Sequence, residues 1–307
     1  MKDKRIGMLM GGFNAEHEVS LNTGRALGDA LRKRGYEVSD IIVDEKLPAA
    51  LVEKRIEVAF VALHGRWGED GCVQGLLEAM RIPYTGSSVL ASALSMDKVV
   101  AKKVFRFHGL RVVEDLVVQA DRARGLEAGD LPFSLPAVVK PSREGSSVGT
   151  SIVRQADQLR EALDEAARFA GDILIERYVP GREIQVGVLD DRVLGAIEVR
   201  PAEAFYNYRA KYAKGAGTQY LFPAPIGPEQ TERVSDLCLK AHQCLGCRGV
   251  SRVDTIFSED EDAFFLLEVN TIPGMTETSL VPKMAAGLGM SFEDLAEQLL
   301  MGAALKA

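Results

Sequence analysis

Two acidic side chains and an asparagine near the C-terminal end of the sequence have the spacing of cation ligands on paired strands. The runs 250–257 and 263–270 are strand-like and flank an acidic turn, which predicts a β-hairpin. If the hairpin is centred near Glu261, Asp254 lies opposite Glu268, and Asn270 shares their face. Facing carboxylates repel each other unless a cation lies between them, and oxygen ligands of this kind suit Mg²⁺ that bridges phosphates. An outward-facing polar surface without a ligand is the alternative.

A run of serines and glycines at 142–149 could bind an anion. It follows a predicted strand at 136–140, and small residues allow consecutive backbone N–H groups to converge on one ligand. Lys140 at the end of that strand favours phosphate over the alternative, an unliganded hairpin. The sequence contains no Gly-Lys dipeptide, which excludes a Walker A loop, and no Gly-x-Gly-x-x-Gly follows a strand.

Arg252 and Gly274 lie close in sequence to the predicted cation ligands. Arg252 is on the same strand face as Asp254 by parity, where it could pair with an acid or hold a substrate carboxylate. Gly274 lies in the segment 271–280 and could bring a backbone N–H close to a reacting centre. A plain turn is the alternative for this glycine.

Two other segments could adjust around a bound ligand. The segment 176–183 contains Pro180-Gly181, a plausible hinge between domains, and ends at Glu183, an acceptor suited to a ribose. A later loop, ending at Gly217, is rich in tyrosine and lysine. Its members Tyr206, Tyr208, Lys211 and Tyr212 could form a lid or only anchor the loop, and spacing does not separate the two.

The four cysteines raise the question of zinc. Cys244 and Cys247 form a Cys-x-x-Cys pair, with Cys238 and His242 upstream. However, Cys238 and Cys244 fall on one apolar face of a predicted helix, and no second ligand pair with zinc spacing exists. We therefore expect thiols near a buried helix face in a reduced, cytoplasmic protein.

The first ninety residues alternate strand and helix patterns. Strands are expected at 5–10, 37–43 and 58–63, and helices at 19–34 and 73–80, which predicts a parallel sheet covered by helices. Ligands of such sheets bind beyond the carboxyl ends of the strands. Glu16 follows the first strand and His64 the third, so both are expected at that edge.

The remainder of the chain has a different pattern. Helices are expected at 98–107, at 159–169 and after Pro228, with a helical tail. Strands are expected at 112–118, 136–140, 151–153, 172–178, 184–189, 193–199, 250–257 and 263–270. We find no internal repeat and no low-complexity tract.

Composition and charge narrow the class of protein. The chain has 307 residues, 47% hydrophobic and 26% charged, which is typical of a globular protein with two or three domains. Its net charge of −7 argues against a nucleic-acid or anionic-membrane partner. No apolar run approaches the roughly 18 residues of a membrane span, and no signal-peptide core is expected.

Taken together, these motifs resemble those of the ATP-grasp enzymes and, at closer range, of the D-alanine–D-alanine ligase family. The resemblance covers residues 6 to 282. Its matching stretches are Gly11-Gly-x-x-x-Glu16-His-Glu-Val-Ser20, Leu63-His-Gly-x-x-Gly-Glu-Asp-Gly71, Tyr84-Thr-Gly-Ser87, Ser95-Met-Asp-Lys98, Lys140-Pro-Ser-Arg-Glu-Gly-Ser-Ser-Val-Gly149, Tyr208-x-x-Lys-Tyr212, Arg252-x-Asp254, Glu268-x-Asn270 and Pro273-Gly-Met-Thr276. Any one stretch is weak evidence, whereas the ordered set is specific.

The resemblance implies an α/β fold in three parts. Residues 1–96 would form a Rossmann-like parallel-sheet domain that binds substrate. Residues 97–181 and 182–307 would form the central and C-terminal parts of an α+β ATP-grasp fold, with ATP clasped between them. A homodimer is a further expectation from the family.

The resemblance also implies which residues hold ATP and metal. Lys98 and Lys140 would hold phosphates, and Glu176 and Glu183 would contact adenine and ribose. The remaining nucleotide contacts would come from Ser146, Ser147, Arg177, Val179 and Lys211. Asp254, Glu268 and Asn270 would carry two Mg²⁺ ions, for which Mn²⁺ could substitute.

The substrate residues follow from the same resemblance. Glu16 would hold the ammonium of the first D-alanine, near His64, and would form a hydrogen-bonded set with Ser146 and Tyr212 that closes the lid. Arg252 and the Gly274 N–H would stabilise a tetrahedral oxyanion. Ser279 and the Leu280 backbone would hold the carboxylate of the second substrate. The Gly-rich end of the lid, 211–217, departs from the family pattern.

The implied reaction is the ligation of two D-alanine molecules through an acyl phosphate, for peptidoglycan precursor synthesis. A related ligase that takes D-lactate or D-serine as its second substrate is the nearest alternative, and Tyr212 argues against it. A non-catalytic nucleotide-binding protein is the alternative from another class.

Overall fold

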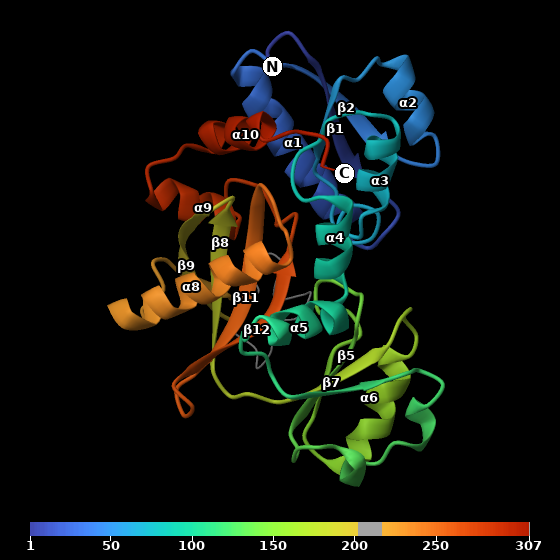
Figure 1. The fold of residues 1–307 in the computed structure, drawn as a ribbon, viewed down its shortest axis with the longest axis vertical. Coiled ribbons are helices and arrows are strands. Elements are labelled where there is room, and N and C mark those ends of the chain that lie inside the picture. The colour runs from blue at the N-terminus through green and yellow to red at the C-terminus, as the bar shows by residue number, and fades with distance from the viewer. Residues whose placement is uncertain (202–216, 307) are drawn as a thin grey trace.

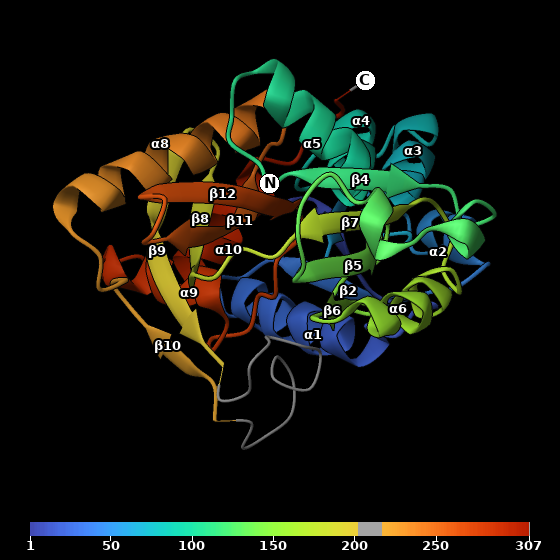
Figure 2. The same cartoon turned by 90° about the horizontal axis from the view of Figure 1, so that it is seen from below.

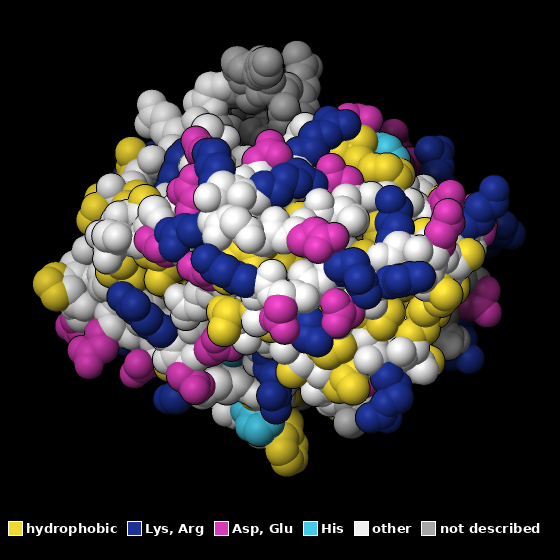
Figure 3. Space-filling model, turned by 90° about the horizontal axis from the view of Figure 1, so that it is seen from above, with side chains coloured by type: hydrophobic (Ala, Val, Ile, Leu, Met, Phe, Trp, Pro, Cys, Tyr) yellow, Lys and Arg dark blue, Asp and Glu magenta, His cyan; other side chains and the backbone are white. Residues whose placement is uncertain are grey.

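The computed structural model describes residues 1–201 and 217–306, and these residues form three β-sheets (Figure 1). The first sheet is parallel, and the other two are antiparallel. None of the helices in these two ranges has the length and apolarity needed to cross a membrane. The face shown in Figure 3 carries acidic and basic side chains interspersed with one another.

The N-terminal sheet confirms the predicted βαβ series. Its strands β1 (Arg5–Gly11), β2 (Glu37–Val43) and β3 (Val58–Val61) are arranged in the order β2-β1-β3. The connecting helices are α1 (His17–Lys33) and α2 (Leu47–Glu53), and α3 (Cys72–Ala79) follows the last strand. Side chains alternate between two buried clusters, one beneath α1 and one beneath α2 and α3.

A helix from the C-terminal end of the sequence covers the outer side of α1. Helix α10 (Phe292–Met301) packs on α1, with Leu295 and Leu299 in the same apolar cluster as Leu27 and Leu31. In Figure 1 the red C-terminal helix accordingly lies beside the blue N-terminal one. The chain then returns toward the edge of the first sheet, where Ala304 bridges Tyr84 and Tyr84 bridges Ala59 of β3.

Two helices lead from the first sheet to the second. Ser88 caps α4 (Val89–Met96) by accepting a hydrogen bond from Ala91 N at 3.2 Å. Asp97 caps α5 (Lys98–Phe107) by accepting hydrogen bonds from Val99 N and Val100 N at 3.0 and 3.1 Å. The cap fixes the first residue of α5 as Lys98.

The second sheet has four strands in the order β4-β7-β5-β6. They are β4 (Asp115–Val118), β5 (Ala137–Pro141), β6 (Ser151–Val153) and β7 (Ile173–Arg177). One face packs on α6 (Leu159–Ala166), through residues such as Val139, Ile173 and Ile175. Side chains alternate along a strand, so Lys140 and Glu176 lie on the opposite face of the sheet. Asp115 on β4 pairs with Glu176 and lies on that face as well. Short 3₁₀ turns occupy Ala123–Gly125, Ala128–Asp130 and Ala156–Gln158.

The third sheet has five strands in the order β10-β9-β8-β11-β12. They are β8 (Arg182–Leu189), β9 (Arg192–Arg200), β10 (Gln219–Leu221), β11 (Val250–Ser258) and β12 (Ala263–Asn270). Helix α8 (Pro228–Cys244) covers the face bearing Ile184 and Val186, and α9 (Leu280–Gly287) packs on the other face (Figure 2).

The structure corrects several predicted elements. The strand expected at 112–118 begins only at Asp115, because Val112 forms a bridge with Leu266 of the third sheet instead. The helix expected at 159–169 ends at Ala166, and the Phe169 ring packs against Gly149. Helices α2 and α4 and strand β10 were not predicted. They have only three to eight residues, and α4 buries Ser92 and Ser95, which hides its apolar stripe.

Candidate active site

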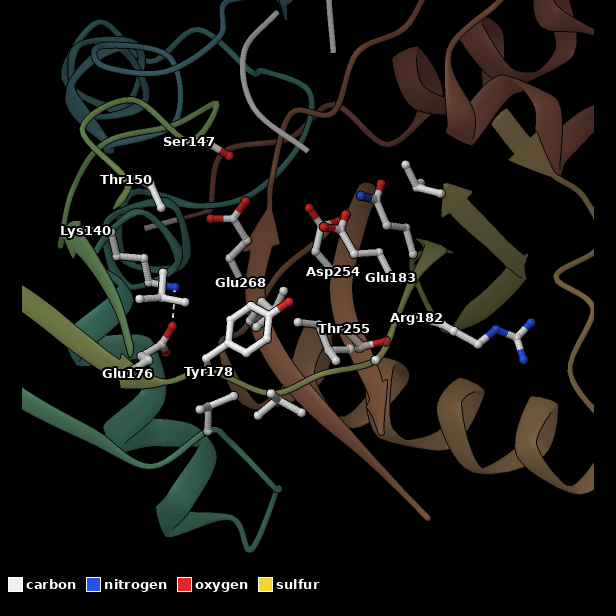
Figure 4. Close-up of a pocket in the computed structure, with 18 of the residues that line it drawn as sticks. Lys140, Ser147, Thr150, Glu176, Tyr178, Arg182, Glu183, Asp254, Thr255 and Glu268 are labelled. Carbon is white, nitrogen blue, oxygen red and sulfur yellow. Dashed lines mark ion pairs between the residues drawn. The ribbon is translucent and has the colours of Figure 1, made fainter. Parts of the chain in front are cut away.

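A pocket of about 490 Å³ lies between the second and third sheets (Figure 4). The strands β5 and β7 supply one wall, and β8, β11 and β12 supply the other. Nine residues predicted to bind nucleotide or metal line it, and they are Lys98, Lys140, Ser147, Glu176, Arg177, Val179, Glu183, Asp254 and Glu268.

The predicted pairing of acidic residues on β11 and β12 is confirmed. Asp254 lies opposite Glu268, and Arg252 lies opposite Asn270. Between Asp254 and Thr255 the register shifts by one, so Leu267 is an extra residue in β12. The two acids therefore face each other only because of this β-bulge. A regular hairpin with the same turn would have offset them by one residue.

Basic side chains neutralise both acids. Arg252 donates two hydrogen bonds to Asp254, from Nε at 2.7 Å and from Nη2 at 2.9 Å. Lys98 Nζ lies 3.0 Å from a Glu268 carboxylate oxygen. Asn270 Nδ2 donates to Asp254 Oδ2 at 3.3 Å. The donor set, two carboxylates and one amide within reach of each other, fits a hard divalent cation such as Mg²⁺.

Lys98 reaches the pocket from the first turn of α5. Its Nζ also donates to the Glu144 carbonyl oxygen at 2.7 Å, which holds it beside the serine loop. Burial works to lower the pKa of Lys98, but the neighbouring Glu268 carboxylate outweighs burial and raises the pKa. The group is therefore a fixed positive charge at neutral pH.

Glu176 on β7 is buried between two ammonium groups. Lys140 Nζ lies 2.5 Å from its Oε2, and Lys102 Nζ contacts its Oε1. Burial alone would raise the pKa of this carboxyl, but Lys140 and Lys102 together lower it to about 2. Figure 4 shows Glu176 and Lys140 side by side on one wall of the pocket. The wall thus carries an ionised acceptor.

The hinge residues predicted to contact the nucleotide, Arg177, Val179 and Glu183, have side chains in different environments. Arg177 donates to Glu261 at 2.9 Å and lies over the Phe265 ring, so its side chain lies against the β11–β12 hairpin. Val179 is buried in an apolar cluster that contains Phe265. Glu183 lines the pocket one position past Arg182 (Figure 4).

The serine loop has a constrained backbone. Ser146 and Ser147 have φ values of 52° and 59°, which is the left-handed region that residues with a side chain seldom adopt. Ser146 Oγ donates to Glu16 Oε1 at 2.6 Å, although 130 positions separate the two residues. The structure therefore brings two of the three members of the predicted set together. The third, Tyr212, lies outside the described residues, as does Lys211.

Glu16 packs closely against glycine backbone. At Gly65, with φ of 66°, a Cβ would lie 2.5 Å from Glu16 Oε2, so a side chain there would strain the backbone and displace the Glu16 carboxylate. At Gly145 of the serine loop, the corresponding distance is 3.2 Å. These two loops hold the carboxylate at the carboxyl edge of the N-terminal sheet, as predicted.

His64 is a buried orienting group with both ring nitrogens engaged. Its Nδ1 lies 2.8 Å from the Ile272 carbonyl oxygen, and its Nε2 lies 2.9 Å from Thr23 Oγ1. This arrangement assigns the proton to Nδ1. Burial lowers the pKa of His64, so the imidazole is neutral.

Glu69 is a buried acid to which the sequence analysis gave no role. Its two oxygens accept hydrogen bonds from Gly65 N at 2.8 Å and Ile272 N at 3.0 Å. Burial and the nearby Glu16 carboxylate raise the pKa of Glu69 to about 8. The sequence feature that could have identified Glu69 is its position in the His-Gly-x-x-Gly-Glu stretch. The carboxyl ties the loop after β3 to the loop after β12.

Gly274 and Ser279 lie together before α9. A Cβ at Gly274 would lie 3.3 Å from Ser279 Oγ, and that oxygen accepts a hydrogen bond from Thr276 N at 3.1 Å. Ser279 is the N-cap residue, and Leu280 begins the helix. Backbone N–H groups at a helix N-terminus favour a bound carboxylate.

Two further residues of the site were missed. Lys102 is one helical turn after Lys98 on α5, which was the available signal. Gln185 lies opposite Asp254 on β8 and lines the pocket. Its Oε1 is buried and finds no hydrogen-bond partner among the described residues, so a ligand that donates a hydrogen bond would satisfy it.

The cysteines are placed as predicted for a helix face. Cys238 is buried in the apolar cluster beneath α8 with Val234 and Ala241. Burial raises the pKa of Cys244 to about 11. All four thiols are free, and residues 1–201 and 217–306 contain no group of three or more His, Cys, Asp or Glu side chains that could hold a metal ion.

Comparisons with known proteins point to one family. Residues 107–301 match the family model described as D-ala D-ala ligase C-terminus, and residues 45–87 match D-ala D-ala ligase N-terminus. A D-alanine–D-alanine ligase of Anaeromyxobacter sp. (strain Fw109-5) is 56% identical over 304 residues, 99% of this chain and 98% of the relative. That of Geobacter sulfurreducens is 50% identical over 307 residues, 100% and 96% of the two chains.

The solved structures agree. A crystal structure of D-alanine–D-alanine ligase from Bacillus anthracis complexed with ATP superimposes with a TM-score of 0.83 and 33% identity. A second structure of the Bacillus anthracis enzyme gives 0.85 and 36%. Both comparisons cover 97% of each chain.

Proposed function

The chain belongs to the D-alanine–D-alanine ligase family, and from this premise we propose how its residues carry out the ATP-dependent ligation of two D-alanine molecules. The observation that carries the proposal is the junction of two sites. The pocket with Lys98, Lys140 and Glu176 adjoins the Glu16–Ser146 contact through the serine loop. A nucleotide site and an ammonium site therefore share one loop.

The first half-reaction phosphorylates a carboxylate, because a carboxylate is a poor electrophile. A carboxylate oxygen of the first D-alanine attacks the terminal phosphorus of ATP, and the bond to ADP breaks. Lys98 and Lys140 would hold the phosphates, with N–H groups of the Ser146–Ser147 turn. Glu16 would hold the ammonium, fixed by the Ser146 hydroxyl and by the close contact with Gly65.

The second half-reaction forms the peptide bond. The free amine of the second D-alanine attacks the acyl carbon, phosphate leaves, and D-alanyl-D-alanine remains. Arg252 and the Gly274 N–H would stabilise the oxyanion, and Ser279 with the N-terminus of α9 would hold the second carboxylate. His64, neutral and hydrogen-bonded at both nitrogens, would orient the loop beside the first substrate.

The remaining nucleotide contacts would be made by the hinge. Glu176 would accept a hydrogen bond from adenine and Glu183 from the ribose, with Arg177 and Val179 contributing backbone between them. Lys211 and Tyr212 belong to the proposal as residues that close over the bound substrates.

Divalent cations would be held by Asp254, Glu268 and Asn270. When bound, Mg²⁺ or Mn²⁺ supplies positive charge that neutralises the phosphates. Arg252 and Lys98 neutralise the two acids otherwise, and the long side chains of both can move aside. A division of the chain at residues 96 and 181, a homodimer and a cytoplasmic location complete the proposal.

The test is phosphate release with MgATP and each of D-alanine, L-alanine, D-serine and D-lactate. We expect rapid release with D-alanine alone, formation of the dipeptide, and loss of both when Mg²⁺ is chelated. Equal release with L-alanine would contradict the stereochemical assignment. ATP binding without D-alanine-dependent turnover would instead favour the non-catalytic alternative.

A further inference from the structure

A lysine that no ligand can touch lies directly behind the nucleotide pocket. The side chain of Lys102 on α5 is only 1% exposed, and its Nζ lies 3.1 Å from Asp115 and in contact with Glu176. Lys102 does not line the pocket, whereas Glu176 does. Lys102 therefore does not touch a ligand in the pocket, and its contact with the pocket lining is through Glu176.

The sheet register explains why a cation is needed there. Asp115 on β4 lies directly opposite Glu176 on β7, so two carboxylates face each other on one side of the sheet. Like charges in this position repel, and burial makes the repulsion stronger. Lys102 bridges the two acids, and Arg106 pairs with Asp115 from the outer side.

Apolar side chains line part of the pocket that holds Glu176. They are Val113, Val138, Val179, Ile256 and Leu267, and Val138 lies directly opposite Glu176 on the neighbouring strand. The cationic residues Lys98 and Lys140 line the pocket near the serine loop. Apolar walls accept a flat ring, and a carboxylate beside them selects which polar group the ring presents.

An ionised carboxylate only accepts hydrogen bonds, while a protonated one can also donate. We propose that Lys102 sets the purine specificity of the pocket by holding Glu176 as an ionised acceptor that takes a ring amino group and rejects a ring carbonyl. This inference rests on the proposed function, since it requires a nucleotide base against Glu176.

Lys140 cannot supply the same effect alone. Its side chain is 12% exposed and lines the pocket, so a phosphate competes with Glu176 for its ammonium group. Lys102 has no such competitor. It remains the permanent counter-ion when Lys140 engages the nucleotide. Without Lys102, Lys140 would be the remaining counter-ion of Glu176 on this wall, and once a phosphate takes Lys140 the carboxyl would take up a proton and no longer only accept hydrogen bonds.

The pKa of Glu176 agrees with this role. Burial would raise it, but the two lysines bring it to about 2, so the acid is ionised at neutral pH. With one lysine removed and the facing Asp115 left in place, burial and like charge would both raise the pKa.

The experiment compares ATP with GTP, whose purine carries a carbonyl where adenine carries an amino group. The variants are Lys102→Met, Glu176→Gln and, as a matched control, Lys103→Met, an exposed lysine on the same helix. For each, kcat and KM are measured with both nucleotides and D-alanine. Calorimetric binding of ADP and GDP needs no turnover.

We expect the wild type to prefer ATP, and Lys102→Met and Glu176→Gln to reduce that preference by about tenfold or more. The loss in Lys102→Met should lie mainly in the KM for ATP. Lys103→Met should retain the preference. A folded Lys102→Met protein with the wild-type preference in both assays would overturn the inference, as would an unchanged preference in Glu176→Gln.

A double variant and a binding measurement allow a conclusion even if Lys102→Met does not fold or the protein does not ligate D-alanine. If Lys102→Met does not fold, the double variant Lys102→Met/Asp115→Asn removes the facing carboxylate, and it should show the same reduced preference. If no variant of the protein ligates D-alanine, the proposed function fails, while the ADP and GDP affinities still decide the role of Lys102. Equal ADP and GDP affinities in the wild type would overturn it.

Discussion

Two pairs of carboxylates face each other across neighbouring strands, and helix α5 supplies a lysine to each. Asp115 and Glu176 share the buried Lys102, which contacts both acids. Asp254 and Glu268 have separate partners, Arg252 and Lys98, which come from different elements. The first pair is closed by a cation of the protein, whereas the second is neutralised by groups that can leave.

The two pairs therefore differ in whether their counter-ions are fixed parts of the fold or can be replaced by a ligand. At the first pair the side chains of Asp115, Glu176 and Lys102 are at most 5% exposed, so their charges are neutralised without a ligand. At the second pair Lys98 and Glu268 line the pocket, where the proposed phosphates and divalent cations would compete for both. Lys98 and Lys102 are one helical turn apart, so neither sequence spacing nor residue type distinguishes their roles.

The largest expected effect is on stability at the closed pair. Lys102→Met leaves two facing carboxylates buried without their shared cation, and we expect the free energy of unfolding to fall by about 3–5 kcal/mol. Lys98→Met should cost less, about 1–2 kcal/mol, because Glu268 is 20% exposed and lines the pocket, where water can solvate it. Urea denaturation measures both, with Lys103→Met as the control. Equal losses for Lys98 and Lys102 would remove the distinction.

At the exchangeable pair the expected effect is on rate. Glu268→Gln keeps the shape but removes a charge from the proposed cation site, so we expect phosphoryl transfer to fall by about 10²-fold or more. Stability should change little, because repulsion with Asp254 is relieved. Phosphate release and thermal unfolding are measured together, with the exposed Glu161→Gln as control. A turnover near that of the wild type at ordinary Mg²⁺ would show that Glu268 is not a ligand.

Glu69 and Glu16 form a third pair of acids, in which a proton on Glu69 takes the place of a cation. The pKa of Glu69 is raised to about 8 by burial and by Glu16, so the folded protein binds a proton there that the unfolded chain releases above its ordinary pKa of 4.5. The resulting stability is present at low pH and is lost as pH rises toward 8.

Glu69→Gln should remove this dependence. Relative to the wild type, the variant should gain about 1 kcal/mol of stability per pH unit between about pH 5 and pH 8. Denaturation curves at four pH values measure the slope. Parallel stability profiles for the two proteins would mean that Glu69 is ionised in the folded state.

The smallest effect is expected away from all three pairs. Changing Cys244 and Cys247 together to Ala should leave ligation intact and cost about 1–2 kcal/mol of stability through lost packing. Rates and unfolding curves give the comparison. Stoichiometric zinc in the purified wild type that disappears in the double variant would contradict the helix-face interpretation.

The sequence predicted those parts of the site that depend on strand parity and local motifs. The order and type of most strands, the facing of Asp254 and Glu268, and the position of Glu16 at the edge of the first sheet are confirmed. Each follows from a period of two residues or from a strand-to-loop boundary. The parity argument succeeded at Asp254 with the help of a β-bulge that no pattern indicates.

What the sequence could not predict are partners brought from other elements. Nothing local pairs Lys102 with Glu176, 74 positions away, or Glu69 with Ile272. Both contacts depend on how sheets and helices pack against each other. Arg252 is the opposite case, because its partner Asp254 lies two residues away on the same strand and parity had already offered an acid as one of its two roles.

The return of α10 to the N-terminal helix has a consequence for synthesis on the ribosome. Leu27 and Leu31 of α1 share one buried apolar cluster with Leu295 and Leu299 of α10. Translation proceeds at roughly 5–20 residues per second, so the side of α1 that α10 covers waits roughly 10–40 s for its partner helix. Ribosome-bound chains stalled after residue 96 should therefore bind a hydrophobic dye or a chaperone, and released full-length protein should not.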